Sequence, residues 1–277
     1  MKDTMAFATI TTLNTYPVKS CRGIPLQEAA LQLTGLQSDR HWMVVSETGR
    51  YLTQRELPRM ALIVPQLSGQ ALSLTAPGMT PLHLLPEVEG AAAEVSVVYD
   101  RISAHDAGQQ AAEWLSRFLE RPVRLVRFDP QISRPIRPEF WQGRTDSSVE
   151  FSDGFPVLVI SQASLDDLNT RLQTPLPMSR FRPNVVIDGL QPYEEDRIQK
   201  LVHGPLRLQM VRPCTRCKIT TTDQVTGEVS GAEPLATLKS YRWSKELRGI
   251  MFGQYAIVAG GAGNRLHVGQ RLQIGWK

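Results

Sequence analysis

Two cysteines lie beside arginine in the segment RPCTRCKITTTD, residues 212–223. Cys214 and Cys217 flank Arg216, and Arg212 precedes them. Nearby cationic side chains favour a thiolate over a thiol, and a thiolate can bind a metal. The chain has only three cysteines, so four thiolates cannot form a structural zinc site. A metal site that uses a single protein thiolate remains open.

The two-residue gap between these cysteines is also typical of redox disulfides, of half of a zinc site and of ordinary packing at the end of a strand. A thioredoxin-like pair lies at the amino-terminal end of a helix. Here LRLQMVR before the pair and KITTTD after it alternate like strands. The pattern therefore disfavours the thioredoxin-like interpretation and leaves metal ligation and packing open.

A second group of residues could bind an anion. Lys19 and Ser20 follow Pro17 in a turn, and Arg40 lies just before an apolar run. A phosphate dianion prefers a cation together with hydroxyl or amide donors. The plain alternatives are a solvated lysine and an arginine paired with a neighbouring acid.

Further candidate binding residues lie at the starts of expected strands or within them. Guanidinium and carboxamide groups that point the same way could bind a polar heterocycle or a phosphate, and glycine lets a ligand approach the main chain. The alternatives are the start of an edge strand, a β-turn and a core tyrosine with a satisfied hydroxyl. These residues are Asp153, Gly154, Arg182, Asn184 and Tyr255.

The elements that must position these residues are mainly β. Short alternating or β-branched runs recur between Gly, Pro, Asn and Asp, which predicts a barrel or a strongly bent sheet. Helices are expected at 107–120, at 164–172 with Ser164 as the cap, and at 234–247. The runs expected as strands include FATITTL, HWMVVS, ALSLTA, EVSVVYD, VRLVRF, FPVLVIS, LRLQMVR, CKITTTD and FGQYAIVAG.

A proline-rich segment without a sustained period, residues 129–148, separates the two halves. We place a domain boundary there, which gives an N-terminal β-rich domain at 1–128 and a second domain at 129–277. The segment could instead line the substrate entrance, because long structureless loops are often functional. The side chains that would do so are Arg134, Arg137, Phe140, Trp141 and Arg144.

Bulk properties exclude some classes of protein. A chain of 277 residues that is 42% hydrophobic can bury a substantial core. Its net charge of +4 comes without a long basic run, which argues against nucleic-acid binding. No window reaches the roughly 18 apolar residues that span a bilayer, and no signal segment is apparent, so we expect a cytoplasmic protein with no membrane partner.

Seven pieces of the sequence resemble the MOSC superfamily of molybdenum-cofactor proteins. The similarity is to the branch that reduces amidoximes and hydroxylamines, which includes the mitochondrial amidoxime-reducing component and bacterial reducers of hydroxylaminopurines. It implies a barrel-like MOSC fold at 129–277 after a MOSC_N domain at 1–128. The pieces are YPVKSCRGIPL, SDRHW, FSDGFPVLVISQASLDDLN, FRPNVVIDG, RPCTRC, EPLATLKSYR and FGQYAIV.

The resemblance also implies roles for residues. Cys217 matches the molybdenum ligand, and one protein sulfur suffices because molybdopterin supplies the others. Cys214 and Cys21 have no such assignment, and we expect both to be packed. The residues that match cofactor-binding positions are Lys19, Ser20, Arg40, Asp153, Gly154, Arg182, Asn184, Thr215, Arg216, Cys217 and Tyr255.

The implied reaction is a two-electron reduction of the N–O bond of hydroxylaminopurines, amidoximes or hydroxylamines, a detoxifying activity. Asp223 and His41 are candidate proton donors. A ferredoxin domain needs four cysteines, which this sequence lacks, so we expect a separate ferredoxin- or flavodoxin-type electron donor. The alternatives are a sulfur transferase with a persulfide on Cys217 or Cys214, and a non-catalytic molybdopterin carrier.

Overall fold

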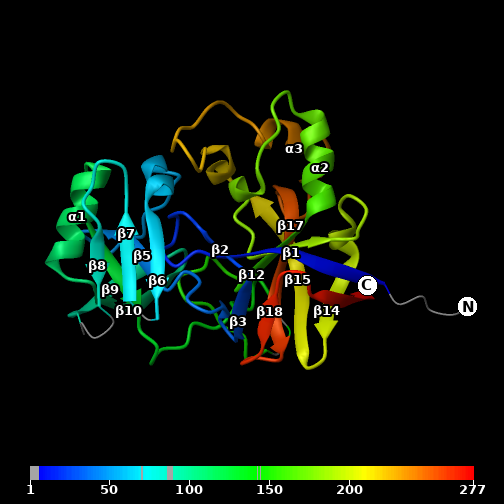
Figure 1. Cartoon of the computed structure of the whole chain (residues 1–277), viewed down its shortest axis with the longest axis horizontal. Coiled ribbons are helices and arrows are strands. Elements are labelled where there is room, and N and C mark those ends of the chain that lie inside the picture. Colours follow the sequence, from blue (N-terminus) through cyan, green and yellow to red (C-terminus); the bar gives the residue numbers. More distant parts are fainter. Residues whose placement is uncertain (1–5, 70, 86–89, 142, 144) are drawn as a thin grey trace, which may run out of the picture.

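A computed structural model describes residues 6–69, 71–85, 90–141, 143 and 145–277. Two lobes lie side by side (Figure 1). The strands and helix of residues 42–128 form one lobe, and the second half of the chain forms the other. The strand of residues 7–15 belongs to the second lobe. It lies there between strands from the second half of the chain.

The second lobe contains a barrel of seven strands that closes because its first and last members also pair. Alternate side chains of these strands point inward, as the pleat requires, and Ile10, Val159 and Leu208 are fully buried there. In order around the barrel the strands are β12 (Val157–Ser161), β13 (Val185–Asp188), β1 (Phe7–Thr15), β19 (Arg271–Trp276), β14 (Ile198–His203), β15 (Leu206–Arg216) and β17 (Gly249–Gly260).

The first lobe has a separate core under one helix. Ala111, Leu115 and Phe118 lie on one face of α1 (Gln109–Leu119) and pack into a buried cluster with Trp42 and Leu125. The strands of this lobe are β5 (Trp42–Ser46), β11 (Val123–Phe128), β10 (Asp100–Asp106) and β9 (Ala92–Val97) in one sheet, and β6 (Val64–Ser68), β7 (Ala71–Thr75) and β8 (Leu82–Leu84) in another.

Shorter elements connect the lobes and cover the barrel. The strands are β2 (Ile24–Leu26), β3 (Glu28–Gln32), β4 (Gly35–Leu36), β16 (Trp243–Ser244) and β18 (Arg265–His267). The helices are α2 (Gln162–Arg171) and α3 (Leu235–Arg242), and the 3₁₀ turns are η1 (Pro58–Leu62), η2 (Met178–Arg180), η3 (Glu194–Arg197) and η4 (Lys218–Thr221).

The fold is mainly β with a barrel, as the sequence predicts. The helix expected at 107–120 is α1, and the one expected at 164–172 is α2. The domain division at residue 128 stays a prediction, because β1 from the first half pairs with β13 and β19.

Three local predictions are wrong. KITTTD is not a strand: residues 218–221 form η4, in which Thr220 and Thr221 hydroxyls donate to backbone carbonyls three residues earlier. The helix expected at 234–247 ends at Arg242, since Trp243 pairs with Ile250 of β17. Ser161, not Ser164, is the N-cap residue of α2.

Among the residues that the structure describes, no helix is both long and apolar enough to cross a membrane.

Candidate functional site

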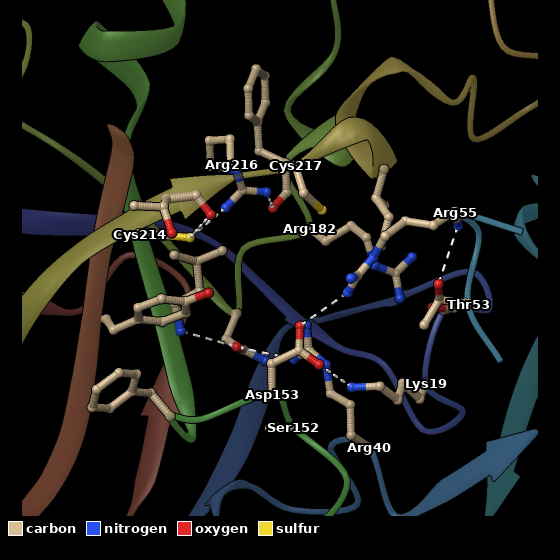
Figure 2. A pocket seen from close by; sticks show the side chains of 18 residues that line it. Lys19, Arg40, Thr53, Arg55, Ser152, Asp153, Arg182, Cys214, Arg216 and Cys217 are labelled. Carbon is tan, nitrogen blue, oxygen red and sulfur yellow. Dashed lines mark hydrogen bonds and ion pairs between the residues drawn. The ribbon is translucent and has the colours of Figure 1, made fainter. Parts of the chain in front are cut away.

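One pocket, lined by residues from both halves of the chain, collects nearly all of the residues that match cofactor-binding positions (Figure 2). Gly154 does not line it; a side chain there would meet the Phe140 ring at 3.1 Å. The other ten of the eleven line it, namely Lys19, Ser20, Arg40, Asp153, Arg182, Asn184, Thr215, Arg216, Cys217 and Tyr255.

The pocket also contains residues that sequence reasoning missed. Thr53 and Arg55 come from the segment between β5 and η1, in which neither residue has a distinctive neighbour or spacing. Only their position next to the predicted residues in three dimensions reveals them. The remaining lining residues are Ser152, Phe155, Leu158, Phe181, Cys214 and Ile219.

Cys217 stands at the end of the long strand β15. The pairing of β15 with β17 shifts register around Pro213, which has no N–H to donate, and such bulges re-aim side chains. Cys217 is exposed, whereas Cys21 and Cys214 are buried. The N–H and hydroxyl of Thr220 both donate to the Cys217 carbonyl at 3.1 and 3.0 Å, which fixes the backbone and leaves the sulfur facing the pocket.

Cys214 and Arg216 form a separate contact beside the exposed thiol. Nη1 of Arg216 donates to Sγ of Cys214 at 2.9 Å, and Nη2 donates to the Phe181 carbonyl at 2.6 Å. Nε of Arg216 is buried and has no hydrogen-bond partner among the described residues. Two hydrogen bonds therefore hold the Arg216 guanidinium in place, while its Nε–H remains available to a ligand. Cys21 packs in the core of the first lobe, and burial raises the pKa of its thiol to about 12.

Lys19, which is buried, forms an ion pair with Asp153, whose side chain is half exposed, away from Cys214 and Arg216 in Figure 2. Nζ of Lys19 also donates to the Phe151 carbonyl at 2.8 Å. Burial lowers the pKa of Lys19, which Asp153 partly opposes. For Asp153, burial acts to raise the pKa, but the charge and hydrogen bond of Lys19 outweigh it and lower the pKa to about 2. Asp153 is thus ionised at neutral pH.

Two guanidinium groups pack on the ring of Tyr16. The centre of the Arg182 guanidinium lies 4.3 Å from the ring centroid, and that of Arg40 lies 4.4 Å from it. Arg40 also contacts Asp39 and donates to Oδ1 of Asn184 at 3.2 Å. Burial lowers the pKa of Arg182 to about 10, so this arginine is poorly compensated in the absence of an anion.

Three residues of this pocket have left-handed backbone although none is glycine. Ser20, Arg40 and Arg182 have φ angles of 66°, 52° and 56°. Such conformations cost on the order of 1–3 kcal/mol each and persist where the surrounding structure enforces them. All three line one pocket, so the strained backbone at these positions serves to direct their side chains into it.

Arg134 supports the pocket from behind. It is 4% exposed, and its guanidinium donates to the carbonyls of Glu150 and Ser152 at 2.7 and 2.6 Å and to Asp100 at 2.7 Å. These bonds hold the segment that carries Asp153. The expectation that Arg134 lines the substrate entrance is therefore not what the structure describes.

Other predicted residues lie away from the pocket. His41 pairs with Glu150 and Asp223 pairs with Arg180, and neither lines the pocket. Phe140 and Trp141 pack against a buried cluster of Ile136, Phe155 and Ile257. Arg137 pairs with Asp100 and Glu139, and Arg144 lies outside the described residues.

The donor set fits an anionic group that supplies further metal ligands of its own. Five cationic side chains line the pocket, Lys19, Arg40, Arg55, Arg182 and Arg216, against the single carboxylate of Asp153. Nε atoms of Arg55 and Arg216 are buried without partners, and one thiol is exposed beside them. Within the described residues no three His, Cys, Asp or Glu side chains cluster to hold a metal ion, so a metal here would need non-protein ligands.

Known proteins resemble this chain over most of its length. The human mitochondrial amidoxime-reducing component 1 is 40% identical over 266 residues, covering 90% of this chain and 78% of its own. The Xenopus laevis component 1 is 35% identical, covering 92% and 79%, and the human component 2 is 37% identical, covering 84% and 72%. The crystal structure of the YUAD protein from Bacillus subtilis aligns over 98% of this chain and 97% of its own at 9% identity, with a TM-score of 0.44.

Two family models match in the order of the two halves. The MOSC N-terminal beta barrel domain matches residues 7–122, and the MOSC domain matches residues 146–273. Both matched ranges contribute to the pocket, Lys19 to Arg55 from the first and Ser152 to Tyr255 from the second. The chain is therefore a member of the MOSC family.

Proposed function

We propose that this protein is a molybdenum-cofactor-dependent reductase of N-hydroxylated compounds, with Cys217 as the protein ligand of the metal. Membership of the MOSC family and relatives named amidoxime-reducing components support a reductase associated with this cofactor. The observation that carries the proposal is the exposed Cys217 thiol in a pocket lined by five cations and one carboxylate. A thiolate and a dianion-binding pocket are what molybdopterin requires of a protein.

The pocket residues form two groups, one that would bind the phosphate of the cofactor and one that would lie beside the metal. Lys19, Ser20 and Arg182 would bind the phosphate end through charge-assisted hydrogen bonds, while Thr215 and Arg216 flank the metal side. Asn184 holds Arg40 by accepting its hydrogen bond at 3.2 Å. When bound, the cofactor supplies a two-electron redox centre able to remove the oxygen of an N–O bond.

Protonation states limit what the side chains can do at neutral pH. Asp153 has a pKa of about 2, so it accepts hydrogen bonds and does not act as an acid. Burial, with the adjacent Cys214, raises the pKa of Tyr255, so its hydroxyl stays protonated and can donate. The Tyr255 ring stacks on Phe155 with centroids 5.0 Å apart, which gives a planar substrate an aromatic wall.

The proposed electron donor is a ferredoxin- or flavodoxin-type protein, since residues 1–277 contain three cysteines and an iron–sulfur cluster of the ferredoxin type needs four. The substrates are hydroxylaminopurines, amidoximes or hydroxylamines. We place this chain in the cytoplasm; the names of its relatives refer to mitochondria.

Elemental and pterin analysis of protein made in a host that produces molybdopterin is the first test. We expect close to one molybdenum and one pterin per chain, and reduction of 6-hydroxylaminopurine with an artificial electron donor. Protein free of both would contradict the proposal. Bound cofactor without reduction would indicate a carrier, and transfer of labelled sulfur from a persulfide donor without molybdenum would indicate a sulfur transferase.

Replacing the thiol tests the ligand. Cys217→Ala should lower turnover at least as much as the roughly 10–100-fold that loss of an outer-shell partner costs. The control is Lys218→Ala, which changes an exposed neighbour that does not line the pocket. Full activity and full metal content in Cys217→Ala would exclude thiolate ligation.

A further inference from the structure

The segment between β5 and η1 contributes Arg55, a cation that forms an ion pair with Asp153 but makes no side-chain hydrogen bond to the described residues. Nε of Arg55 is buried without a hydrogen-bond partner among the described residues. Nη2 of Arg55 lies 3.8 Å from Oδ2 of Asp153, which is too long for a hydrogen bond. About a third of the side chain, 35%, is exposed, so the guanidinium lies at the pocket mouth and not in the core.

The other cations of the pocket each have an internal acceptor. Lys19 has Asp153 and a carbonyl, and Arg40 has Asp39 and Asn184. Arg182 donates to Gln224, and Arg216 donates to a sulfur and a carbonyl. Arg55 is therefore the cation that gains most from an anion in this pocket.

The position of Arg55 is fixed by its neighbours in sequence. The N–H of Arg55 donates to Oγ1 of Thr53 at 3.2 Å, and Thr53 is 2% exposed. Nε2 of Gln54, which is 1% exposed, donates to the Ser20 carbonyl at 2.7 Å and to Oε1 of Gln224 at 3.1 Å. The segment that carries Arg55 is thus tied to Ser20 and to the partner of Arg182.

Figure 2 shows Arg55 and Arg182 reaching into the same space as the Asp153 carboxylate and the Cys217 sulfur. A guanidinium presents several N–H donors in one plane, a geometry that suits phosphate oxygens. The hydroxyl of Thr53 lies beside it on the same lining. Cation and hydroxyl together repeat the pairing of Lys19 with Ser20 on the same pocket.

We propose that Arg55, held by Thr53 and Gln54, is a further phosphate-binding residue of this pocket, contributed by the first lobe. The phosphate belongs either to the cofactor or to a phosphorylated substrate such as an N-hydroxylated nucleotide. The inference deepens the proposed function by adding a binding residue to the same site. Its first test does not require that function to be correct.

The first measurement uses protein made in a host that cannot synthesise molybdopterin, with inorganic phosphate as the probe. Phosphate titration by calorimetry should give a dissociation constant about tenfold larger for Arg55→Gln than for the wild type, since one charge-assisted contact is lost. The control is Arg59→Gln, which removes an arginine that pairs with Glu120 outside the pocket. Equal phosphate affinity in Arg55→Gln and the wild type overturns the proposal.

The second measurement identifies the source of the phosphate in cofactor-loaded protein. A lower pterin content in Arg55→Gln assigns Arg55 to the cofactor. An unchanged pterin content, with a KM raised about tenfold for the N-hydroxylated nucleotide but not for its base, assigns it to the substrate. No change in either quantity overturns the proposal.

The two proposals fail in different ways. Wild-type protein without molybdenum or pterin contradicts the proposed function, while the phosphate titration still decides the role of Arg55. Arg55→Lys should recover part of the phosphate affinity, because it restores the charge without the planar donors. If Arg55 were only structural, Arg55→Gln and Arg55→Lys would lower the melting temperature equally, and added phosphate would not change the difference from the wild type.

Discussion

Some residues of this pocket have a strained left-handed backbone that places their side chains in the pocket. Ser20 and Ser38 have nearly equal left-handed φ angles, 66° and 63°, but only Ser20 lines the pocket. Glycine adopts this conformation without the clash of a Cβ atom. Comparing the two serines therefore distinguishes the energetic cost of the left-handed backbone, which both share, from a role of the hydroxyl in the pocket, which only Ser20 can have.

Ser20→Gly and Ser38→Gly should both leave the melting temperature unchanged or raise it, because each relieves a similar backbone. Only Ser20→Gly should weaken phosphate binding, which calorimetry on cofactor-free protein measures. Equal phosphate affinities in the two variants would show that the Ser20 hydroxyl is not a ligand.

Chemistry at the residue scale was predictable where a residue type is unusual in its local context. The paired cysteines, Lys19 after a proline and Arg182 with Asn184 all stand out in the sequence, and the structure brings them to one pocket. Arg55 was not predictable, because an arginine in a polar loop is ordinary until its neighbours in space are known. Arg134 was misjudged for the same reason: its acceptors are backbone carbonyls of residues 150 and 152, which the sequence does not reveal.

At the scale of elements, the junction of β12, α2 and η3 buries a carboxyl group. Glu195 is fully buried; its oxygens accept from the Ser164 hydroxyl at 2.7 Å and from the Ser161 N–H at 3.3 Å. The carboxyl group thus accepts from the N–H of the N-cap residue of α2 and from a hydroxyl of its first turn, in a helix with no side-chain cap hydrogen bond. Burial raises the pKa of Glu195, and the Ser164 hydrogen bond opposes this only in part.

A raised pKa fixes the sign of the pH dependence. The stability that the protonated Glu195 provides is complete below about 4.5, the ordinary pKa, and is lost as the pH rises through the raised value of the folded protein. Glu195→Gln should therefore raise the melting temperature relative to the wild type more at pH 8 than at pH 4.5. The exposed Glu246→Gln is the control, and a difference that does not vary with pH would contradict the assignment.

Element types were predictable where periodicity was clear. α1 has its apolar residues on one face, and the β12 run FPVLVIS is continuous and apolar, so both appear as expected. The run KITTTD misled because β-branched threonines favour strands in general, whereas here their hydroxyls bond to backbone carbonyls and stabilise η4. The end of α3 depends on the pairing of Trp243 with Ile250, a contact that no local pattern indicates.

At the scale of the whole molecule, the two lobes meet through a buried pair of amides. Nε2 of Gln224 donates to Oε1 of Gln54 at 2.9 Å, and Gln54 donates back at 3.1 Å. Gln54 precedes α1 and belongs to the first half of the chain, whereas Gln224 follows η4. The pair couples the segment of Arg55 to that of Arg182, so the pocket and the lobe contact form one structure.

Gln54→Ala and Gln224→Ala should each lower the free energy of unfolding by about 1–3 kcal/mol, since each leaves a buried amide without its partner. The double variant should be non-additive by about 0.5–3 kcal/mol in a chemical denaturation cycle. Gln54→Ala combined with Gln209→Ala should be additive, because Gln209 bonds elsewhere, to the Gln199 and Met210 carbonyls. Additivity in both cycles would mean that the two amides do not couple the lobes.

The place of β1 in the barrel has a consequence for how the protein is made. Thr9 of β1 lies between Asp188 of β13 and Arg271 of β19, so β1 pairs with a strand that is made more than 250 residues later. Translation of the intervening chain takes on the order of tens of seconds. During that time the stretch of β1 that pairs with β19 has no permanent partner, and an unpaired strand edge is exposed to aggregation.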